Sequence, residues 1–400
     1  MVATLTLFTV LNSSPVFANG QTTHLWITDT AVTHVTTDSL KALLTTERNS
    51  LRVGTMFPDG GYAIGHPYSE VAHWEPFQDR FRDWILDSFD NPSSPEAAPY
   101  VAFYLGLASH GMADQVFDSM YMERSKAYDA DLGWSEASES LDTSQDVVFA
   151  DLTGPQSVPE MSIPDVLPEL FYEAGVEVDM GTLEDGQGWL EIAVDGVGGM
   201  SEVSTLVDSH IDAFPWGCSH LLDDSIPGAP PFEARVVAKY WESLWADLHG
   251  DPSPLAIIGS WPIDQTEGFS LGADDVEARL SVVFNRSLFD NDVSHDHFGV
   301  TASESPVPIN LDLFYGNDSH VVNVSPELGW QSDAIHTFTV DGMSATDGRS
   351  QTEPFELEFN TGHYPTESTE PPKGCGCTNA SAPVWPWAWL IPMVCAIRRR

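Results

Sequence analysis

The most informative segment of this sequence is Tyr104-Leu105-Gly106-Leu107-Ala108-Ser109-His110-Gly111-Met112-Ala113-Asp114. Its apolar residues predict a buried helix, which we place at residues 99–124. His110, Asp114 and Asp118 follow one another at intervals of four, and four residues advance an α-helix by about 400°, so their side chains form one row. Buried carboxylates need partners or a metal ion, and Zn²⁺ accepts N and O ligands. On spacing alone, a row that faces water is the alternative.

Helical spacing of apolar residues extends on both sides of this segment, to about residue 250. Further helices are predicted at 39–48, 76–89, 166–174, 191–214 and 231–249. After Asp251-Pro252-Ser253-Pro254 the pattern changes to alternation. This alternation predicts strands at 278–284, 308–313, 320–324, 334–340 and 355–359. We therefore expect a multidomain chain, with an all-α domain at 19–250 and an all-β sandwich at 251–362.

The chain is strongly acidic. Its 400 residues contain 60 Asp and Glu against 16 Lys and Arg, which gives a formal net charge of −44. Such a surface repels nucleic-acid phosphates, so no nucleic-acid partner is expected without intervening cations. With 42% hydrophobic residues the chain buries enough apolar surface to fold, which argues against intrinsic disorder.

The N-terminal residues predict export. The apolar run from Leu5 to Ala18 is too short to span a bilayer, and it ends in Val16-Phe17-Ala18 before polar residues. We interpret 1–18 as a signal peptide, although its first residues lack Lys and Arg. The expected location is the cell surface or outer membrane, or the medium after processing of the C-terminal tail.

The C-terminal residues predict a membrane anchor. Gly374-Cys375-Gly376-Cys377 is followed by an apolar segment at 383–397 and by Arg398-Arg399-Arg400. Residues 363–374, rich in Pro, Thr and Glu, form an expected linker. Residues 375–400 resemble the C-terminal sorting signal of myxobacterial surface proteins. That resemblance implies attachment to the membrane and a sorting or processing protease as a partner.

Three further segments each contain a candidate metal ligand. They are His24-Leu25-Trp26-Ile27, the predicted turn Pro58-Asp59-Gly60-Gly61, and His73 within Ser69-Glu70-Val71-Ala72-His73-Trp74-Glu75-Pro76-Phe77. Taken singly each is unremarkable, since a lone His beside Trp is more often packed than ligating. In this order, and followed by the helical row, they resemble the zinc-dependent phospholipase C family, most closely the N-terminal domain of glycosylphosphatidylinositol-specific phospholipase D.

This resemblance implies a set of metal ligands. By it, ligand positions are occupied by His24, Asp59, His73, His110, Asp114, Asp142 and Asp146. The sequence departs from the family in having Asp118 or Met120 where a further His is usual, and Ser138 where a His precedes the later carboxylate pair. Asp118 and Glu139 can substitute as oxygen ligands. We therefore expect two or three Zn²⁺ ions, with Ca²⁺ or Mn²⁺ credible at one site.

The function implied is that of an exported metal-dependent phosphodiester hydrolase, similar to phospholipases C and D. Its substrate would be a phospholipid or another phosphodiester, and Asp59 is the candidate catalytic residue that holds or deprotonates the attacking water. The strand-rich part resembles bacterial immunoglobulin-like domains of surface-layer proteins. That likeness implies a spacer or binding module, and its sequence contains no catalytic cluster.

Two alternatives remain open from the sequence. One is a zinc single-strand nuclease, which the acidic composition disfavours. The other is a non-catalytic surface protein for adhesion or cation binding, in which Met120 and Ser138 mark a decayed metal site.

Overall fold

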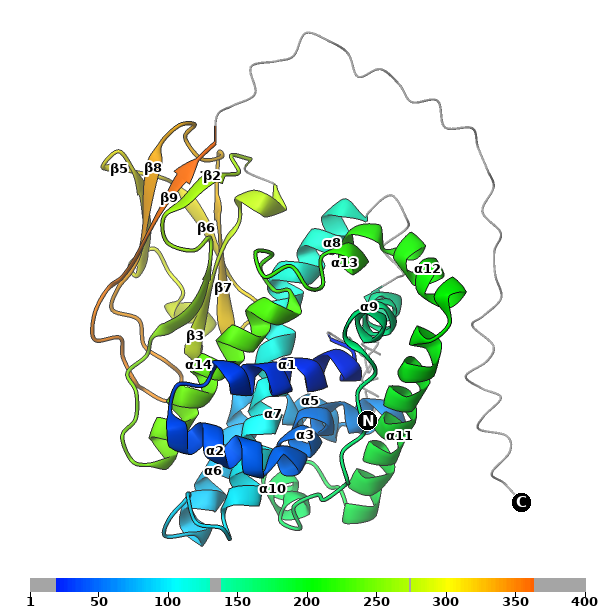
Figure 1. The fold of residues 1–400 in the computed structure, drawn as a ribbon. Helices are drawn as coiled ribbons and strands as arrows, with labels where there is room; N and C mark the ends of the chain where they lie inside the picture. The colour runs from blue at the N-terminus through cyan, green and yellow to red at the C-terminus, as the bar shows by residue number, and fades with distance from the viewer. Residues whose placement is uncertain (1–18, 130–137, 273–274, 363–400) are drawn as a thin grey trace, which may run out of the picture. The chain divides into compact units, whose positions relative to one another are not determined.

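A computed structural model describes residues 19–129, 138–272 and 275–362 of the protein, without the side chains of 138–140. All of them belong to the first of two units into which the chain divides, 1–363 and 364–400. Within the described residues, helices occupy the N-terminal part and strands the C-terminal part, as predicted (Figure 1). The predicted signal peptide, linker and sorting segment lie outside the described residues.

The helical part contains helices of very different length. They are α1 (Gln21–His34), α2 (Asp38–Thr46), α3 (Arg48–Met56), the 3₁₀ turn η1 (Phe57–Asp59), α4 (Gly60–Ile64), α5 (Tyr68–Ala72), α6 (Glu75–Ser88), α7 (Ala98–Val116), the π-helical turn η2 (Phe117–Met122), α8 (Glu123–Tyr128), α9 (Ser138–Thr153), α10 (Leu167–Glu173), α11 (Met180–Ser201), α12 (Ser204–Ala213), α13 (Pro215–Ser219) and α14 (Pro230–Leu248). Most predicted helices agree with these bounds to within one or two residues.

Helix α7 lies at the centre of this part and is buried along almost its whole length, packed against α3, α6 and α14 (Figure 1). Glycines allow its close contact with α3. A Cβ atom added at Gly106 would lie 2.1 Å from the carbonyl oxygen of Leu51, and one added at Gly54 would lie 2.1 Å from that of Phe103. The two helices can approach this closely only because both positions lack a side chain.

Three local predictions are wrong. The segment predicted as one helix at 191–214 belongs to two helices, α11 and α12, because the chain leaves the helical conformation near Val203. Helix α11 also begins earlier than predicted, at Met180, where the Asp179 carboxylate caps it by accepting a hydrogen bond from the Thr182 N–H. The helix predicted at 99–124 is interrupted by η2. The turn predicted at Pro58–Gly61 is instead η1 followed directly by α4.

The strand-rich part forms two sheets. Its strands are β1 (Ile257–Trp261), β2 (Thr266–Phe269), β3 (Leu280–Leu288), β4 (Phe298–Ala302), β5 (Ser305–Pro306), β6 (Ile309–Leu313), β7 (Ser319–Pro326), β8 (Ile335–Val340) and β9 (Phe355–Thr361), with short 3₁₀ turns η5 (Val276–Ala278) and η6 (Asp290–Asp292). One sheet has the order β1-β3-β7-β6 and the other β2-β9-β8-β4-β5. All pairs are antiparallel except β2 with β9.

The two sheets share one apolar core, to which β3 contributes Phe284, β4 contributes Phe298 and β8 contributes Phe338. The five predicted strands are present. The sequence did not predict β1, β2, β4 and β5, because these strands have at most five residues and β1, β2 and β4 each contain a glycine. The immunoglobulin-like character of this part stays a prediction.

The helical and sheet parts share a second apolar core, in which Val283 and Val321 of the sheet join residues of α7 and α14. Charged groups also cross this boundary. The Arg286 side chain, 1% exposed, donates to Glu75 at the start of α6 and pairs with Asp247 of α14. The strand-rich part is therefore packed on the helices and not only tethered to them.

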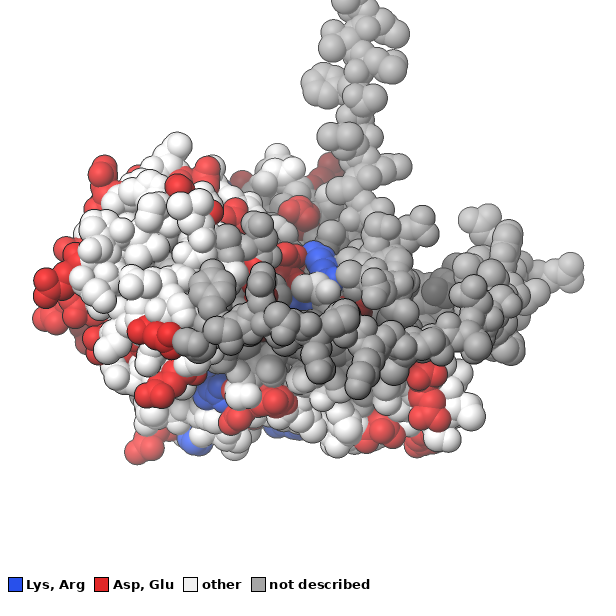
Figure 2. All heavy atoms as spheres, turned by 90° about the horizontal axis from the view of Figure 1, so that it is seen from above, with Lys and Arg blue, Asp and Glu red and all other residues white. Residues whose placement is uncertain are grey.

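The acidic composition is visible at the surface. Figure 2 shows Asp and Glu spread over the described part of this face, with few Lys or Arg. None of the described helices combines the length and apolar character needed to cross a membrane.

Candidate metal centre

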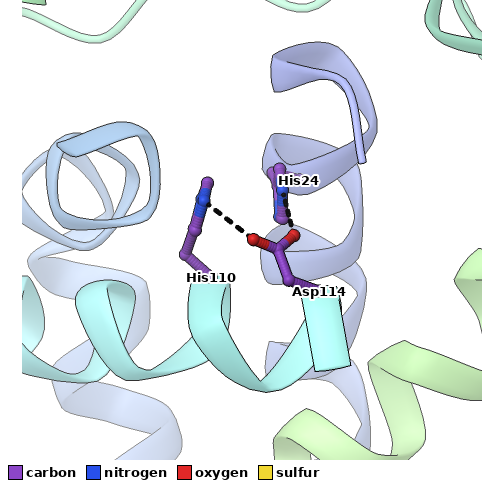
Figure 3. A group of neighbouring side chains, drawn as sticks. All are labelled: His24, His110 and Asp114. Carbon is purple, nitrogen blue, oxygen red and sulfur yellow. Dashed lines mark ion pairs between the residues drawn. The ribbon is translucent and has the colours of Figure 1, made fainter. Parts of the chain in front are cut away.

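Five of the predicted ligand side chains, from four segments of the helical part, converge on one point. They are His24 on α1, Asp59 on η1, His73 just after α5, and His110 and Asp114 on α7. Three of them are labelled in Figure 3, where His24 and His110 point toward the Asp114 carboxylate from two helices. The rings of His24 and His110 stack with centroids 3.9 Å apart.

Backbone carbonyls fix the orientation of two imidazoles. His110 Nδ1 lies 2.8 Å from the carbonyl oxygen of Thr55 on α3, and His73 Nδ1 lies 2.6 Å from that of Ser69 on α5. A carbonyl oxygen only accepts, so each Nδ1 carries the proton that it donates. The Nε2 atom of each ring is left to point at the centre. A hydrogen bond from one ring nitrogen to a backbone carbonyl commonly orients a histidine whose other nitrogen binds a metal.

The ligand atoms lie within a few ångströms of one another. His73 Nε2 is 3.1 Å from His110 Nε2, 3.3 Å from Asp59 Oδ1 and 3.4 Å from Asp114 Oδ2. His110 Nε2 is 3.5 Å from Asp59 Oδ1 and 3.3 Å from Asp114 Oδ2. His24 Nε2 is 3.0 Å from Asp114 Oδ1.

These atoms form two overlapping groups suited to a divalent ion. One comprises His24, His110 and Asp114, the other Asp59, His73 and His110, and within each group the ligand atoms lie within 4.8 Å of one another. Zn²⁺ binds such sets of imidazole nitrogens and carboxylate oxygens. The donor chemistry of both groups therefore fits a divalent metal ion.

The five groups strongly perturb one another. Burial lowers the pKa of His110, but the Asp114 and Asp59 carboxylates raise it more, to about 10. Burial raises the pKa of both carboxyls, and the neighbouring imidazoles more than reverse this, so that both pKa values lie below their usual range. For His24, burial and the charge on His110 together lower the pKa. Without a metal, the protonation of each imidazole in the centre therefore depends on the neighbouring carboxylates, and that of each carboxylate on the imidazoles.

Sequence reasoning missed one residue that contacts this cluster. The Gln21 side-chain amide, on the first turn of α1, donates to Asp59 Oδ2. This leaves Asp59 Oδ1 directed at the two histidines. A glutamine in a first helical turn carries no sequence signal for such a role.

The five side chains of the centre differ in their exposure to solvent. The side chains of Asp114 and His73 are 14% and 11% exposed, against 6% or less for the other three. A groove of about 430 Å³ begins at Trp74, the residue after His73. It is lined by Glu70, Val71, Trp74, Pro76, Phe77, Arg80, Ala174, Tyr315, Asn317 and Asp318. Both the helical and the sheet parts therefore line this groove.

Asp118, predicted to continue the row of His110 and Asp114, does not join the five. It lies in the π-helical turn η2, where the spacing of an α-helix no longer holds. Its Oδ2 accepts a hydrogen bond from the Tyr315 hydroxyl of the sheet part. Burial raises the pKa of Asp118 to about 8, against the opposing effect of that hydrogen bond.

Two more buried carboxylates lie near Asp114 and Asp118. Asp142 on α9 is 4% exposed, and neither of its oxygens accepts a hydrogen bond within the described residues. Glu233 on α14 is fully buried, with Oε2 accepting from the Asn19 side-chain amide at 2.8 Å and Oε1 unpartnered. Burial and neighbouring carboxylates raise the pKa of both groups well above the usual range. The sequence did not single out Glu233, because an acid in the first turn of a helix is ordinary.

The remaining predicted ligands have other surroundings. The Asp146 carboxylate accepts hydrogen bonds from Thr22 N, Thr23 N and Thr23 Oγ1 at 3.1, 2.7 and 2.9 Å. It therefore anchors the first turn of α1, which carries His24, and burial still raises its pKa to about 6. The Glu139 side chain lies outside the described residues. Cys218 is buried, and burial raises its pKa to about 12.

Comparison with known proteins places these residues in context. The chain is similar to the phosphatidylinositol-glycan-specific phospholipase D of Rattus norvegicus, with 31% identity over 90 residues, or 21% of this chain and 11% of that enzyme. The enzyme of Homo sapiens is 28% identical over 303 residues, covering 69% of this chain and 35% of the relative. That of Dictyostelium discoideum is 38% identical over 63 residues, 15% of this chain and 7% of the relative. The matched segments thus span about a third or less of these relatives.

No protein-family model matches the chain. Among solved structures, the S-layer protein SbsC aligns over 81% of this chain and 46% of its own, with 9% identity and a TM-score of 0.22. At that score the two chains need not share a fold. The distant sequence similarity to phospholipase D enzymes is what bears on function.

Proposed function

We propose that this protein is a metal-dependent phosphodiester hydrolase that acts on a phospholipid-type substrate. The observation that carries the proposal is the convergence of three imidazoles and two carboxylates from α1, η1, α5 and α7 on one partly accessible point. The distant similarity to phospholipase D enzymes supports the same reaction class.

The proposed ligands of two divalent ions, zinc by their donor chemistry, are His24, Asp59, His73, His110 and Asp114. Bound ions would supply a Lewis acid for the phosphoryl oxygens and a more acidic water. The chain's own residues orient and hold protons: Nδ1 of His73 and of His110 each donates to a carbonyl, and Gln21 restrains Asp59. Asp59 is the proposed residue that holds or deprotonates the attacking water.

A further ion, of a harder kind, is proposed for three buried carboxylates that lie outside the two groups of ligand atoms described above. Asp118, Asp142 and Glu233 are all buried and supply only oxygen, the ligand that Ca²⁺ and Mn²⁺ prefer. Each has at least one oxygen without a hydrogen bond among the described residues. Burial raises the pKa of all three carboxyls, so without a cation they hold protons that a bound ion would replace.

Export is part of the proposal. Cleavage after Ala18 would make Asn19 the first residue of the mature protein. The Asn19 side chain already contacts buried Glu233 at 2.8 Å, so the new terminus would lie beside the carboxylates. The protein for every experiment below should therefore be produced both as the full chain and with its N-terminus at Asn19.

The test is the paired substitution His110→Ala with Asp114→Ala. We expect the variant to lose most bound zinc, measured by mass spectrometry of the metal content, and its hydrolysis of bis(p-nitrophenyl) phosphate. His34→Ala with Asp38→Ala, an exposed His and Asp also four residues apart, should change neither. Full hydrolysis by the His110/Asp114 variant would refute the proposal, provided that circular dichroism shows it to be folded.

Substrate assays separate the alternatives. Head-group release from phospholipid vesicles should exceed cleavage of single-stranded DNA, because a −44 protein repels a polyanion. The reverse result would favour a nuclease. Less than one tightly bound metal ion per wild-type chain would favour a non-catalytic surface protein.

A further inference from the structure

The strand-rich part reaches the segments that carry the metal ligands at three points. The Tyr315 hydroxyl donates to Asp118, the backbone N–H of His320 donates to Gln115 Oε1 at 2.8 Å, and Arg286 Nη1 donates to Glu75 Oε1 at 2.7 Å. Gln115 directly follows Asp114 in the chain, and Glu75 is two residues beyond His73. A mere spacer between the helices and a surface would not need contacts at these places.

Tyr315 is held in place by a tight turn between β6 and β7. Its φ is +68°, in the left-handed region, and Gly316 follows with φ +77°. The turn is closed by the Gly316 N–H donating to the Leu313 carbonyl at 2.8 Å, and Asn317 Oδ1 accepts from the Asp290 N–H at 2.8 Å. A non-glycine residue in this backbone region is unfavourable, so the surrounding contacts must stabilise it.

The side chain of Tyr315 makes two contacts with the site at once. Its hydroxyl reaches Asp118, which is 2% exposed, while the residue as a whole is 48% exposed. Its ring packs edge-on against Trp74, with centroids 5.6 Å apart, and both rings line the groove described above. The hydroxyl therefore holds a buried carboxylate, and the ring forms part of the wall of a groove that includes Trp74, the residue after His73.

We propose that Tyr315 is a positioning residue, by which the strand-rich part completes the active site. The hydroxyl fixes one oxygen of Asp118 and leaves Oδ1, which makes no hydrogen bond, free to hold a cation. The ring bounds the space that the substrate occupies next to His73. This inference rests on the proposed function, and it assigns the sheet part a role in catalysis that a spacer or separate binding module would not have.

The test compares Tyr315→Phe and Tyr315→Ala with the control Tyr128→Phe in the full chain. Tyr128 also donates its hydroxyl to a carboxylate across the boundary between helices and sheets, to Glu277 at 3.1 Å. It lies outside the groove and the proposed metal sites. Loss of its hydroxyl therefore measures the purely structural effect of such a hydrogen bond.

We expect Tyr315→Phe to weaken binding of Mn²⁺, measured by calorimetry on metal-free protein, by about 10- to 100-fold, as is typical for a residue that orients a ligand. The kcat for bis(p-nitrophenyl) phosphate should fall by a similar factor with KM unchanged. Tyr315→Ala should raise KM as well, because the groove loses its wall. Tyr128→Phe should stay within about twofold of wild type.

Two results would decide against the inference. The inference would be overturned if Tyr315→Phe and Tyr128→Phe had the same Mn²⁺ affinity and the same kcat. It would also be overturned if the losses of affinity and kcat in Tyr315→Phe were fully explained by lower thermal stability. If wild-type protein hydrolyses none of the phosphodiesters, the proposed function fails, while a drop in Mn²⁺ affinity specific to Tyr315→Phe still supports the positioning role.

Discussion

His73 Nε2 and His110 Nε2 lie 3.1 Å apart, although each ring donates its Nδ1 proton to a backbone carbonyl. If both rings are neutral, two lone pairs face each other beside the Asp59 and Asp114 carboxylates. Such an arrangement is unfavourable unless a proton or a metal ion lies between the ligands. The backbone carbonyls that fix the two rings thus favour binding of a cation between the Nε2 atoms.

The first prediction follows from this pair. Removal of metal with EDTA should lower the melting temperature, and added ZnCl₂ should restore it, because a ligand of the native state stabilises it by RT ln(1 + [L]/Kd). At 1,000 times Kd this amounts to about 4 kcal/mol. The measurement is thermal unfolding by circular dichroism, with MgCl₂ as the control ion. A melting temperature that ignores both EDTA and zinc would contradict the prediction.

The second prediction concerns pH. In metal-free protein the pKa of Asp118 is raised to about 8 and that of His110 to about 10. Above pH 6.5 both groups bind more protons in the native than in the unfolded state, so stability should fall as pH rises from 6.5 to 9. The lowered pKa of His24 opposes this trend, and its effect fades as the pH rises past the ordinary value of 6.5. The slope is about 1.4 kcal/mol per pH unit for each proton.

Denaturant unfolding at pH 6.5, 7.5 and 9 in EDTA measures this slope. Asp118→Asn should flatten the part below pH 8, because the amide does not titrate. Bound zinc should remove the part of the dependence that comes from His110, since it replaces the proton on that ring. Stability that rises between pH 6.5 and 9 in the metal-free protein would show that the charge coupling described here is wrong.

Some residues of the centre were predictable from helix geometry and from a family pattern in the sequence. His110 and Asp114 are one α-helical turn apart, and their common face follows from helix geometry. His24, Asp59 and His73 were predicted as ligands of the same centre because their segments match a family pattern. Asp118 was misplaced because the π-helical turn η2 breaks the four-residue repeat, and no residue in it signals that turn.

Other parts of the site depend on tertiary contacts that leave no local pattern. Glu233 becomes notable only because α14 packs it, fully buried, beside Asn19. Tyr315 belongs to a turn of the sheet part, and only the packing of that part on the helices brings its hydroxyl to Asp118. The predicted alternation located the longer strands, whereas short strands such as β5 have too few residues to alternate.

The third prediction tests the packing that supports the centre. In Gly106→Ala the new methyl group would meet the Leu51 carbonyl oxygen at 2.1 Å and Thr55 N at 2.8 Å, so α3 and α7 must separate. Overpacking of this kind costs about 1–3 kcal/mol. Because the Thr55 carbonyl orients His110, zinc affinity should fall too.

Gly188→Ala on α11 is the matched control, since an added Cβ there meets nothing within 4 Å. It should stabilise the protein by about 0.5–1 kcal/mol, as alanine does in a helix interior. Urea unfolding and zinc calorimetry on both variants give the comparison. Equal zinc affinity in the two variants would show that the α3–α7 contact does not position His110.

The last prediction concerns Glu233 and asks whether this carboxylate binds a metal ion or has only a structural role. Glu233→Gln keeps the shape and the acceptor for Asn19 but removes a buried charge near Asp114 and Asp118. Metal-free protein should become more stable at pH 8, because burying that charge is unfavourable. Mn²⁺ affinity should fall, because one of three proposed oxygen ligands loses its charge. Glu184→Gln, at an exposed position of α11, should change neither quantity. A variant that gains stability yet binds Mn²⁺ as wild type does would show that Glu233 is not a ligand. Of the three carboxylates proposed for the further ion, Asp118 and Asp142 would then remain.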